Sequence, residues 1–151
     1  MTLPLIDIRR EEVDAPTAAT WEALVERSPD GGSNRAGPLF ARLLGCDSVE
    51  VSGEPGATGS TVPGFRVTRS QPPRELSLAG KHRFSEYTLD FRIDDHGDGG
   101  SVLSAITHAA FPGLKGQLYK TAVIRSRAHV LATKRMLRSI ARRTERARLK
   151  R

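Results

Sequence analysis

Arg83–Ile93, with the sequence RFSEYTLDFRI, is the stretch that decides the fold. Polar and apolar side chains alternate along it, which predicts a β-strand, because successive side chains of a strand point to opposite faces of the sheet. Four apolar side chains share one face: Tyr87, Leu89, Phe91 and Ile93. The other face is polar, so the strand belongs to a sheet with one apolar face, and another layer must cover that face.

Shorter alternating runs on both sides of this strand extend the sheet. Turns are predicted at Pro72-Pro73 and at Gly80-Lys81, and Asp94–Gly100 (DDHGDGG) has the composition of a hairpin loop. The glycine- and proline-rich stretch Gly53–Pro63 predicts a longer loop. We expect six strands in all: Ile6–Val13, Val49–Ser52, Phe65–Arg69, Leu76–Leu78, Arg83–Ile93 and Ser101–Phe111.

Two short helices and one long helix complete the pattern. Pro16 follows the first strand and predicts a helix at Thr17–Glu26, because proline suits the first turn of a helix. Pro38–Leu44 predicts a second short helix. Between Gly116 and Arg148 no proline or further glycine interrupts a run of helix formers, which predicts one long helix. Its apolar side recurs at intervals of about seven residues: Val123, Ile124, Val130, Leu131, Leu137 and Ala141.

This order of elements predicts an α+β domain. An antiparallel sheet wraps around the long C-terminal helix, and the two short helices follow the first strand. We expect residues 1–141 to form this single domain and residues 142–151 to form a basic helical tail that frays into solvent.

Two further motifs carry a resemblance to a known family. Ile8–Pro16 (IRREEVDAP), followed by Trp21 and Leu24, and the turn and strand Pro72–Leu76 (PPREL) match its element order, as does the terminal helix. The chain resembles the helix-grip fold of the START-like superfamily, also called SRPBCC, which includes polyketide cyclase/dehydrase-type and birch-pollen-allergen-like proteins. The match covers nearly the whole chain, although the family usually has seven strands.

The composition excludes several classes of protein. No apolar run approaches the roughly 18–20 residues of a membrane span, and the N-terminus lacks the apolar segment of a secretory signal. Cys46 is the single cysteine, so an internal disulfide and a cysteine-rich zinc site are excluded, and the cytoplasm is the expected location. The histidines lack metal-ligand spacing, and no phosphate-binding or dinucleotide-binding glycine loop is present, so we expect no metal and no cofactor.

The resemblance implies a pocket between the sheet and the long helix that holds a small hydrophobic molecule. Such a gap is physically reasonable, because a helix laid across a bent sheet leaves space beneath it. The alternative is a solid core made by the same side chains. The residues expected to line the pocket are Phe65, Val67, Tyr87, Leu89, Phe91, Val130 and Leu137.

Three polar residues are candidates for the same pocket: His82, His108 and Arg127. An imidazole near a tyrosine or serine can transfer protons, so a cyclase or dehydratase type of enzyme on this fold is the alternative function. The competing interpretation is a histidine whose ring nitrogens are hydrogen-bonded within the protein and which has no catalytic role. No catalytic constellation is recognisable, and whether the protein is an enzyme stays open.

The positive charge is confined to one segment. The whole chain carries +7, but Lys115–Arg151 holds four Lys and nine Arg against one acid, a net +12, which leaves −5 for the rest. Three interpretations stay open for residues 134–151: a solvated helix end, contact with an anionic membrane, or contact with nucleic acid. The sequence predicts neither the ligand nor the oligomeric state.

Overall fold

A computed structural model describes residues 3–26, 52–62, 64–125 and 128–150 of the chain. The predicted helix at Pro38–Leu44, the greater part of the predicted strand Val49–Ser52, and Cys46 lie outside the described residues. The strands are β1 (Leu5–Val13), β2 (Thr61–Val62), β3 (Phe65–Gln71), β4 (Glu75–His82), β5 (Ser85–His96) and β6 (Gly100–Ala110). The helices are α1 (Thr17–Glu26), α3 (Gly113–Arg125) and α4 (Ala128–Leu149).

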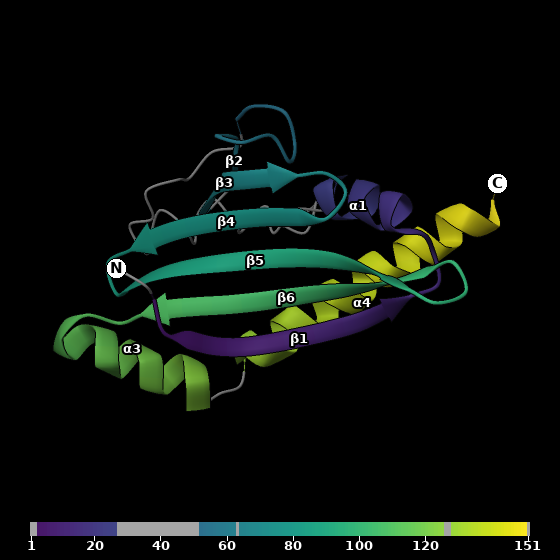
Figure 1. The fold of residues 1–151 in the computed structure, drawn as a ribbon. Coiled ribbons are helices and arrows are strands. Elements are labelled where there is room, and N and C mark those ends of the chain that lie inside the picture. Colours follow the sequence, from purple (N-terminus) through teal and green to yellow (C-terminus); the bar gives the residue numbers. More distant parts are fainter. Residues whose placement is uncertain (1–2, 27–51, 63, 126–127, 151) are drawn as a thin grey trace.

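The six strands form one antiparallel sheet in the order β1-β6-β5-β4-β3-β2 (Figure 1). The predicted central strand is β5, which lies between β4 and β6 and pairs Leu89 with Leu78 and Thr107. β1 returns to the far side of β6, where Leu5 is paired with His108. The α+β helix-grip architecture predicted from the sequence is therefore confirmed.

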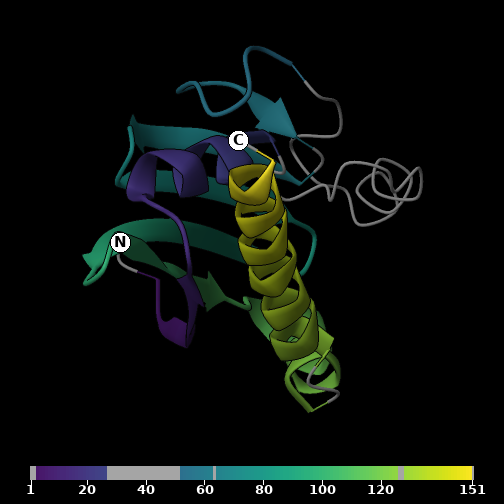
Figure 2. The same cartoon turned by 90° about the vertical axis from the view of Figure 1, so that its right-hand side faces the viewer.

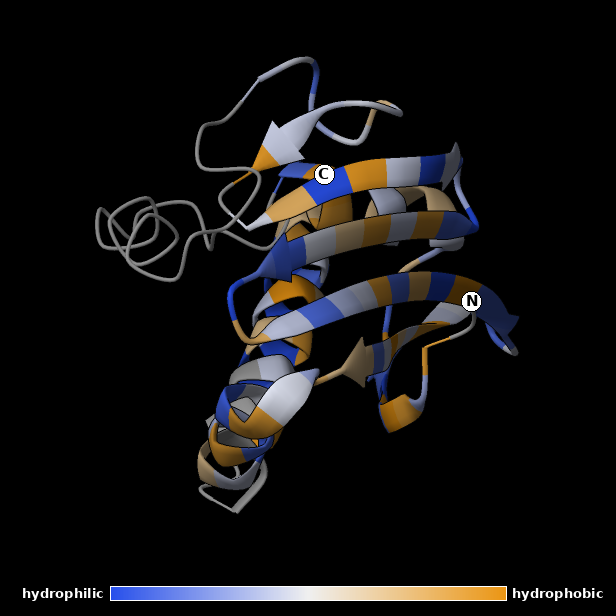
Figure 3. Ribbon diagram, turned by 90° about the vertical axis from the view of Figure 1, so that its left-hand side faces the viewer, coloured by the Kyte–Doolittle hydropathy of each residue, from blue (hydrophilic) through white to orange (hydrophobic). Residues whose placement is uncertain are grey.

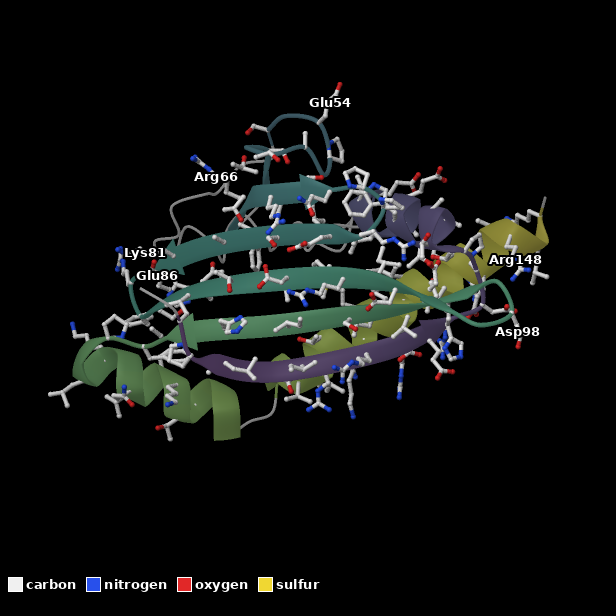
Figure 4. All side chains as sticks on the ribbon, in the orientation of Figure 1. Glu54, Arg66, Lys81, Glu86, Asp98 and Arg148 are labelled. Atoms are coloured by element: carbon white, nitrogen blue, oxygen red, sulfur yellow. The ribbon has the colours of Figure 1, made fainter. Side chains whose placement is uncertain are left out.

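The two faces of the sheet differ in what covers them. α1 and α4 lie on one face, which we call the inner face, and α4 packs chiefly against β1 and α1 (Figures 1 and 2). Apolar and polar residues alternate along the strands, as the period of two requires (Figure 3). Charged side chains stand at the ends of the sheet, among them Lys81 and Glu86 at the β4–β5 turn and Asp98 at the β5–β6 hairpin (Figure 4).

One contiguous apolar core joins the inner face to α1 and α4. Phe91, Leu76, Leu78, Leu103 and Leu24 have no exposed surface at all. On α4 the buried positions recur every three or four residues, with Ile140 and Ala141 adjacent, and so lie on one face of the helix: Thr133, Leu137, Ile140, Ala141 and Thr144. Burial of this face removes apolar surface from water and fixes α4 on the sheet.

A short chain of buried hydroxyls connects α1 to β6. Ser101 Oγ donates to the carbonyl oxygen of Ala15 at 2.9 Å and lies 2.8 Å from Thr20 Oγ1. Because the Ser101 proton is used toward Ala15, the Thr20 hydroxyl is the donor of that second bond. Ser101, Thr20 and Ala15 are fully buried. These bonds satisfy the polar atoms that the α1–β6 contact takes out of water.

The structure corrects the single long helix predicted at Gly116–Arg148. Two helices, α3 and α4, occupy that stretch, and α3 begins earlier, at Gly113. No proline or further glycine marks the division, so helix propensity alone could not locate it. Leu131 was placed on the apolar stripe, but its side chain is 49% exposed, because the buried positions of α4 run along a different line of the helix.

The basic end of the chain continues the helix. α4 extends to Leu149, and Arg148 Nη1 donates to the carbonyl oxygen of Asp14 at 2.8 Å and to Asp14 Oδ1 at 2.9 Å (Figure 4 labels Arg148). The Thr144 hydroxyl is buried and donates to the Ile140 carbonyl at 2.7 Å. The division between a domain at 1–141 and a tail at 142–151 stays a prediction, although α4 runs through it without interruption.

Two other predicted connections, one turn and one loop, differ from expectation. Gly80-Lys81 is not a turn: β4 continues to His82, and Arg83 and Phe84 form the turn instead. The predicted loop Gly53–Pro63 contains a short strand, β2, and Ser52 forms an isolated bridge with Thr61. A strand of two residues is too short to leave an alternating pattern in the sequence.

Leu137→Ala tests the packing of α4 on the sheet. Leu137 is 1% exposed and belongs to the core, so its truncation is expected to lower the free energy of unfolding by about 2–5 kcal/mol. Leu131→Ala, on the exposed side of the same helix, is the matched control and should change it by no more than about 0.5 kcal/mol. Urea denaturation measures both, and equal losses would contradict this placement of α4.

Candidate functional site

Aromatic side chains gather at one end of the sheet, where β4 turns into β5 and α3 packs beside it. We call them the aromatic cluster: Phe65, His82, Phe84, Tyr87, Phe111 and Tyr119. His82 is buried, and the other five side chains are half-buried. The cluster draws on β3, β4, β5 and α3, so it assembles only in the folded chain.

The rings of the cluster contact one another in series. The His82 ring lies 5.1 Å from Tyr119 and 5.6 Å from Tyr87, measured between centroids. Tyr87 meets Phe65 edge to face at 5.2 Å, and Tyr119 stacks on Phe84 at 5.5 Å. These separations are those of favourable aromatic pairs.

Gly80 is the residue that allows Tyr87 to lie flat on the sheet. Gly80 and Tyr87 are directly paired across β4 and β5, and a Cβ atom at Gly80 would come within 2.4 Å of the tyrosine ring and 2.1 Å of the Gly64 carbonyl oxygen. The Tyr87 hydroxyl donates to that same carbonyl at 2.6 Å. Gly80 was predicted to form a turn, but it lies within β4, where its lack of a side chain lets the Tyr87 ring approach the backbone closely.

His82 is held as a neutral ring. The Phe84 backbone N–H donates to Nδ1 at 3.1 Å, which places the proton of the neutral imidazole on Nε2, 2.9 Å from Ser85 Oγ. Burial lowers the pKa of His82 below its ordinary value of 6.5, because a charged ring would lose its hydration. Both ring nitrogens thus have partners within the chain, which matches the interpretation of a satisfied histidine.

Two small residues flank Tyr87 on the inner face of the sheet. Nearer α1, the cross-strand pair Ile93 and Leu103 fills the face with large side chains. In the row that contains Tyr87, its two neighbours across the strands are Gly80 and Ala109. Because Tyr87 lies over Gly80, the sheet contributes only a methyl group on the Ala109 side of that row.

Thr107 adds a polar atom to this part of the inner face, where its partner across β1 and β6 is Asp7. It is paired with Leu89, one row from Ala109, and is 8% exposed. Its Oγ1 is buried and, within the described residues, has no hydrogen-bond partner. A buried hydroxyl without a partner costs about 1–3 kcal/mol, and such a group in a native protein calls for an explanation.

The structure distributes the predicted pocket residues over three places. Phe65 and Tyr87 belong to the aromatic cluster, and Val130 is half-buried on α4. Arg127 lies outside the described residues, as does the side chain of His129. The remaining four are packed together in the core: Val67, Leu89, Phe91 and Leu137.

His108 does not join the other candidate residues. Its neighbours Thr107 and Ala109 are buried on the inner face, so the alternation of the strand turns His108 to the outer face. There its Nδ1 lies 3.8 Å from Asp90 Oδ2. The placement of His108 in a polar pocket was therefore wrong. Four residues of this region were not predicted from the sequence: Thr107, Phe84, Phe111 and Tyr119. Phe84 and Phe111 lie next to predicted turns, which is the one sequence signal for them, and Thr107 and Tyr119 have no such signal.

The sheet with its covering helices is the helix-grip fold, and solved structures share it. CalU16 from Micromonospora echinospora superposes with a TM-score of 0.52 at 16% identity, over 97% of this chain and 92% of that protein. Truncated norcoclaurine synthase from Thalictrum flavum gives 0.54 at 12% identity, over 91% of this chain and 94% of that one. Ara h 8.0201 gives 0.51 at 12% identity, over 91% and 97%.

These comparisons establish the fold of the chain. It is the fold of the START-like, or SRPBCC, superfamily that the sequence resembles. No model of a protein family matches the sequence, and a search of curated proteins finds no match. Among the described residues, no helix is both long and apolar enough to cross a bilayer.

The lowered pKa of His82 predicts a pH dependence of stability. Below about pH 6.5 the unfolded chain takes up a proton that the folded chain resists, so the free energy of unfolding falls as the pH drops. His82→Asn should lose less stability between pH 7.5 and pH 5.5, because an amide can still accept the Phe84 N–H but does not titrate there. Urea denaturation at both pH values measures this loss.

His96→Asn is the control for this experiment. His96 is an exposed residue at the end of β5, and its replacement should leave the pH dependence of the wild type unchanged. If the His82 variant loses as much stability as the wild type, the buried ring is not the group responsible.

Proposed function

We propose that the protein binds a small, largely apolar molecule on the inner face of the sheet, beside the aromatic cluster. The observation that carries the proposal is the Thr107 hydroxyl, which is buried on the same face, one row from Ala109, and has no hydrogen-bond partner among the described residues. A ligand there would lie beside aromatic rings and the Thr107 hydroxyl, with the Asp7–Arg9 ion pair next to it on β1. Apolar surroundings with a few placed polar groups are the usual make-up of a small-molecule site.

The ligand's chemistry follows from these surroundings. The rings of Tyr87, Phe65 and Tyr119 favour an aromatic or polycyclic skeleton. The hydroxyl of Thr107 favours one oxygen or nitrogen atom on that skeleton, since this atom would satisfy it. The fold is compatible with the proposal, since a gap between a curved sheet and the helix laid across it is a place where apolar ligands bind. We place the binding in the cytoplasm, as the single cysteine predicts.

Binding, rather than proton transfer, accounts for the polar residues of the cluster. His82 hydrogen-bonds to Ser85 and to the backbone of Phe84, and Tyr87 hydrogen-bonds to the Gly64 carbonyl. These bonds hold the rings in place. In the proposed site, His82 and Tyr87 therefore form a rigid surface that contacts the ligand.

Ala109→Leu distinguishes a ligand site from a solid core. If the ligand occupies the space beside Ala109, the added side chain is tolerated and weakens binding of the neutral fluorescent probe N-phenyl-1-naphthylamine at least tenfold. Ala110→Leu, the next residue on the outer face, is the matched control and should bind the probe as the wild type does. Fluorescence titration measures the affinities.

A solid core predicts a different result for the same variant. In a fully packed core, Ala109→Leu lowers the free energy of unfolding by about 1–3 kcal/mol, and the wild type fails to bind the probe. That pair of results would overturn the proposed function.

Thr107→Val tests the hydroxyl itself, because valine has nearly the same shape. The free energy of unfolding of the empty protein should rise by on the order of 1 kcal/mol, since an unsatisfied polar atom is removed. Affinity for 2-naphthol should fall about fivefold relative to naphthalene, which has no hydroxyl. Thr88→Val, on the outer face of β5, should change neither quantity; a loss of stability in Thr107→Val would refute this assignment.

A further inference from the structure

The exposed side of α4 is strongly basic, and it is separate from the aromatic cluster. Six cations line a shallow hollow of about 710 Å³ along the helix: Arg135, Arg138, Arg142, Arg143, Arg146 and Lys150. Among the described lining residues, only Ser139 and Ala147 are uncharged. We call this surface the basic face of α4.

The basic face has a fixed geometry. Arg135, Arg138, Arg142 and Arg146 follow one another at three- or four-residue intervals, which places them in a row on one side of the helix. From Arg135 to Lys150 the row is about 22 Å long, at about 1.5 Å per residue. The opposite side of α4 is buried through Leu137, Ile140 and Ala141, so the helix cannot rotate to hide the cations.

Most of this charge is not neutralised by the protein. Arg143 lies 3.2 Å from Glu26, an exposed ion pair. Within the part of the chain that the structure describes, Arg135, Arg138, Arg142 and Arg146 have no ion-pair partner. The segment from Lys115 onward carries +12 while the rest of the chain carries −5, so the basic face stands out from an acidic body.

The chemistry of the face favours a phosphate backbone. Five of the six cations are arginines, whose planar guanidinium groups bind phosphate through two parallel hydrogen bonds. A helix that docks on a membrane inserts an apolar face, but the apolar face of α4 is already covered by the sheet and α1. None of the described lining residues is aromatic, so they offer no ring on which unpaired bases could stack.

From these observations we infer that the basic face of α4 binds the backbone of double-stranded DNA without reading its sequence. A row of about 22 Å spans roughly six base pairs at about 3.4 Å each. The contacts are made with phosphates, so binding is independent of sequence and strongly dependent on salt. This inference does not depend on the proposed ligand site, which lies elsewhere in the fold.

A triple variant tests the assignment: Arg138→Ala, Arg142→Ala and Arg146→Ala together. The probe is a fluorescein-labelled 20-base-pair duplex of arbitrary sequence, and binding is followed by anisotropy at several salt concentrations. The wild type is expected to bind, with affinity falling steeply as salt rises. In the triple variant the affinity should fall at least tenfold at low salt, and the slope of log K against log salt should shrink by about 3, near one per lost phosphate contact.

The control removes three cations from elsewhere: Arg66→Ala, Lys81→Ala and Arg92→Ala, all exposed on other elements. It should retain the wild-type affinity and slope. Equal losses in both triple variants would show a general charge effect and overturn the inference. Failure of the wild type to bind the duplex would overturn it too, as would tighter binding to a single strand. If phosphatidylserine vesicles bind the wild type and the duplex does not, the basic face of α4 binds anionic membranes instead of DNA, and the inference is overturned.

Discussion

The whole structure depends on covering one apolar face of an antiparallel sheet. β5 alone buries Leu89, Phe91 and Ile93 on that face, and no strand of the sheet can shield them. α1 and α4 supply the cover, and where α1 meets β6 the hydroxyls of Thr20 and Ser101 are satisfied by hydrogen bonds. Because the apolar side of α4 is buried in this contact, its other side faces solvent. This arrangement separates the proposed ligand site from the basic face.

Much of the fold could be predicted from periodicity, whereas the site could not. Alternation identified β5 and the strands beside it, and Pro16 located α1, because these signals are local. The boundary between α3 and α4 has no proline or glycine to mark it. Gly80 is typical of a turn, but here it makes space for the ring of Tyr87 within a strand. Such close approaches join segments distant in sequence, so no local pattern records them.

In the candidate site, too, some residues could be recognised from the sequence, whereas their contacts could not. Phe65 and Tyr87 were recognised as apolar residues of the inner face, and they do lie together. Tyr119 reaches the same cluster from α3, but helix periodicity did not single it out. His108 illustrates how a shift of one residue along a strand reverses the face. That Thr107 has no hydrogen-bond partner among the described residues can be recognised only once its neighbours are placed.

The pairing of the first strand with the last has a consequence for synthesis of the chain. β1 has its partner in β6, with Leu5 opposite His108, and it cannot complete the sheet until that distant segment has left the ribosome. At about 5–20 residues per second, β1 waits on the order of 5–20 seconds as an unpaired strand. Charged side chains such as Asp7 and Arg9 are spaced along that segment, and charges on an unpaired strand discourage pairing with a second nascent chain during the interval.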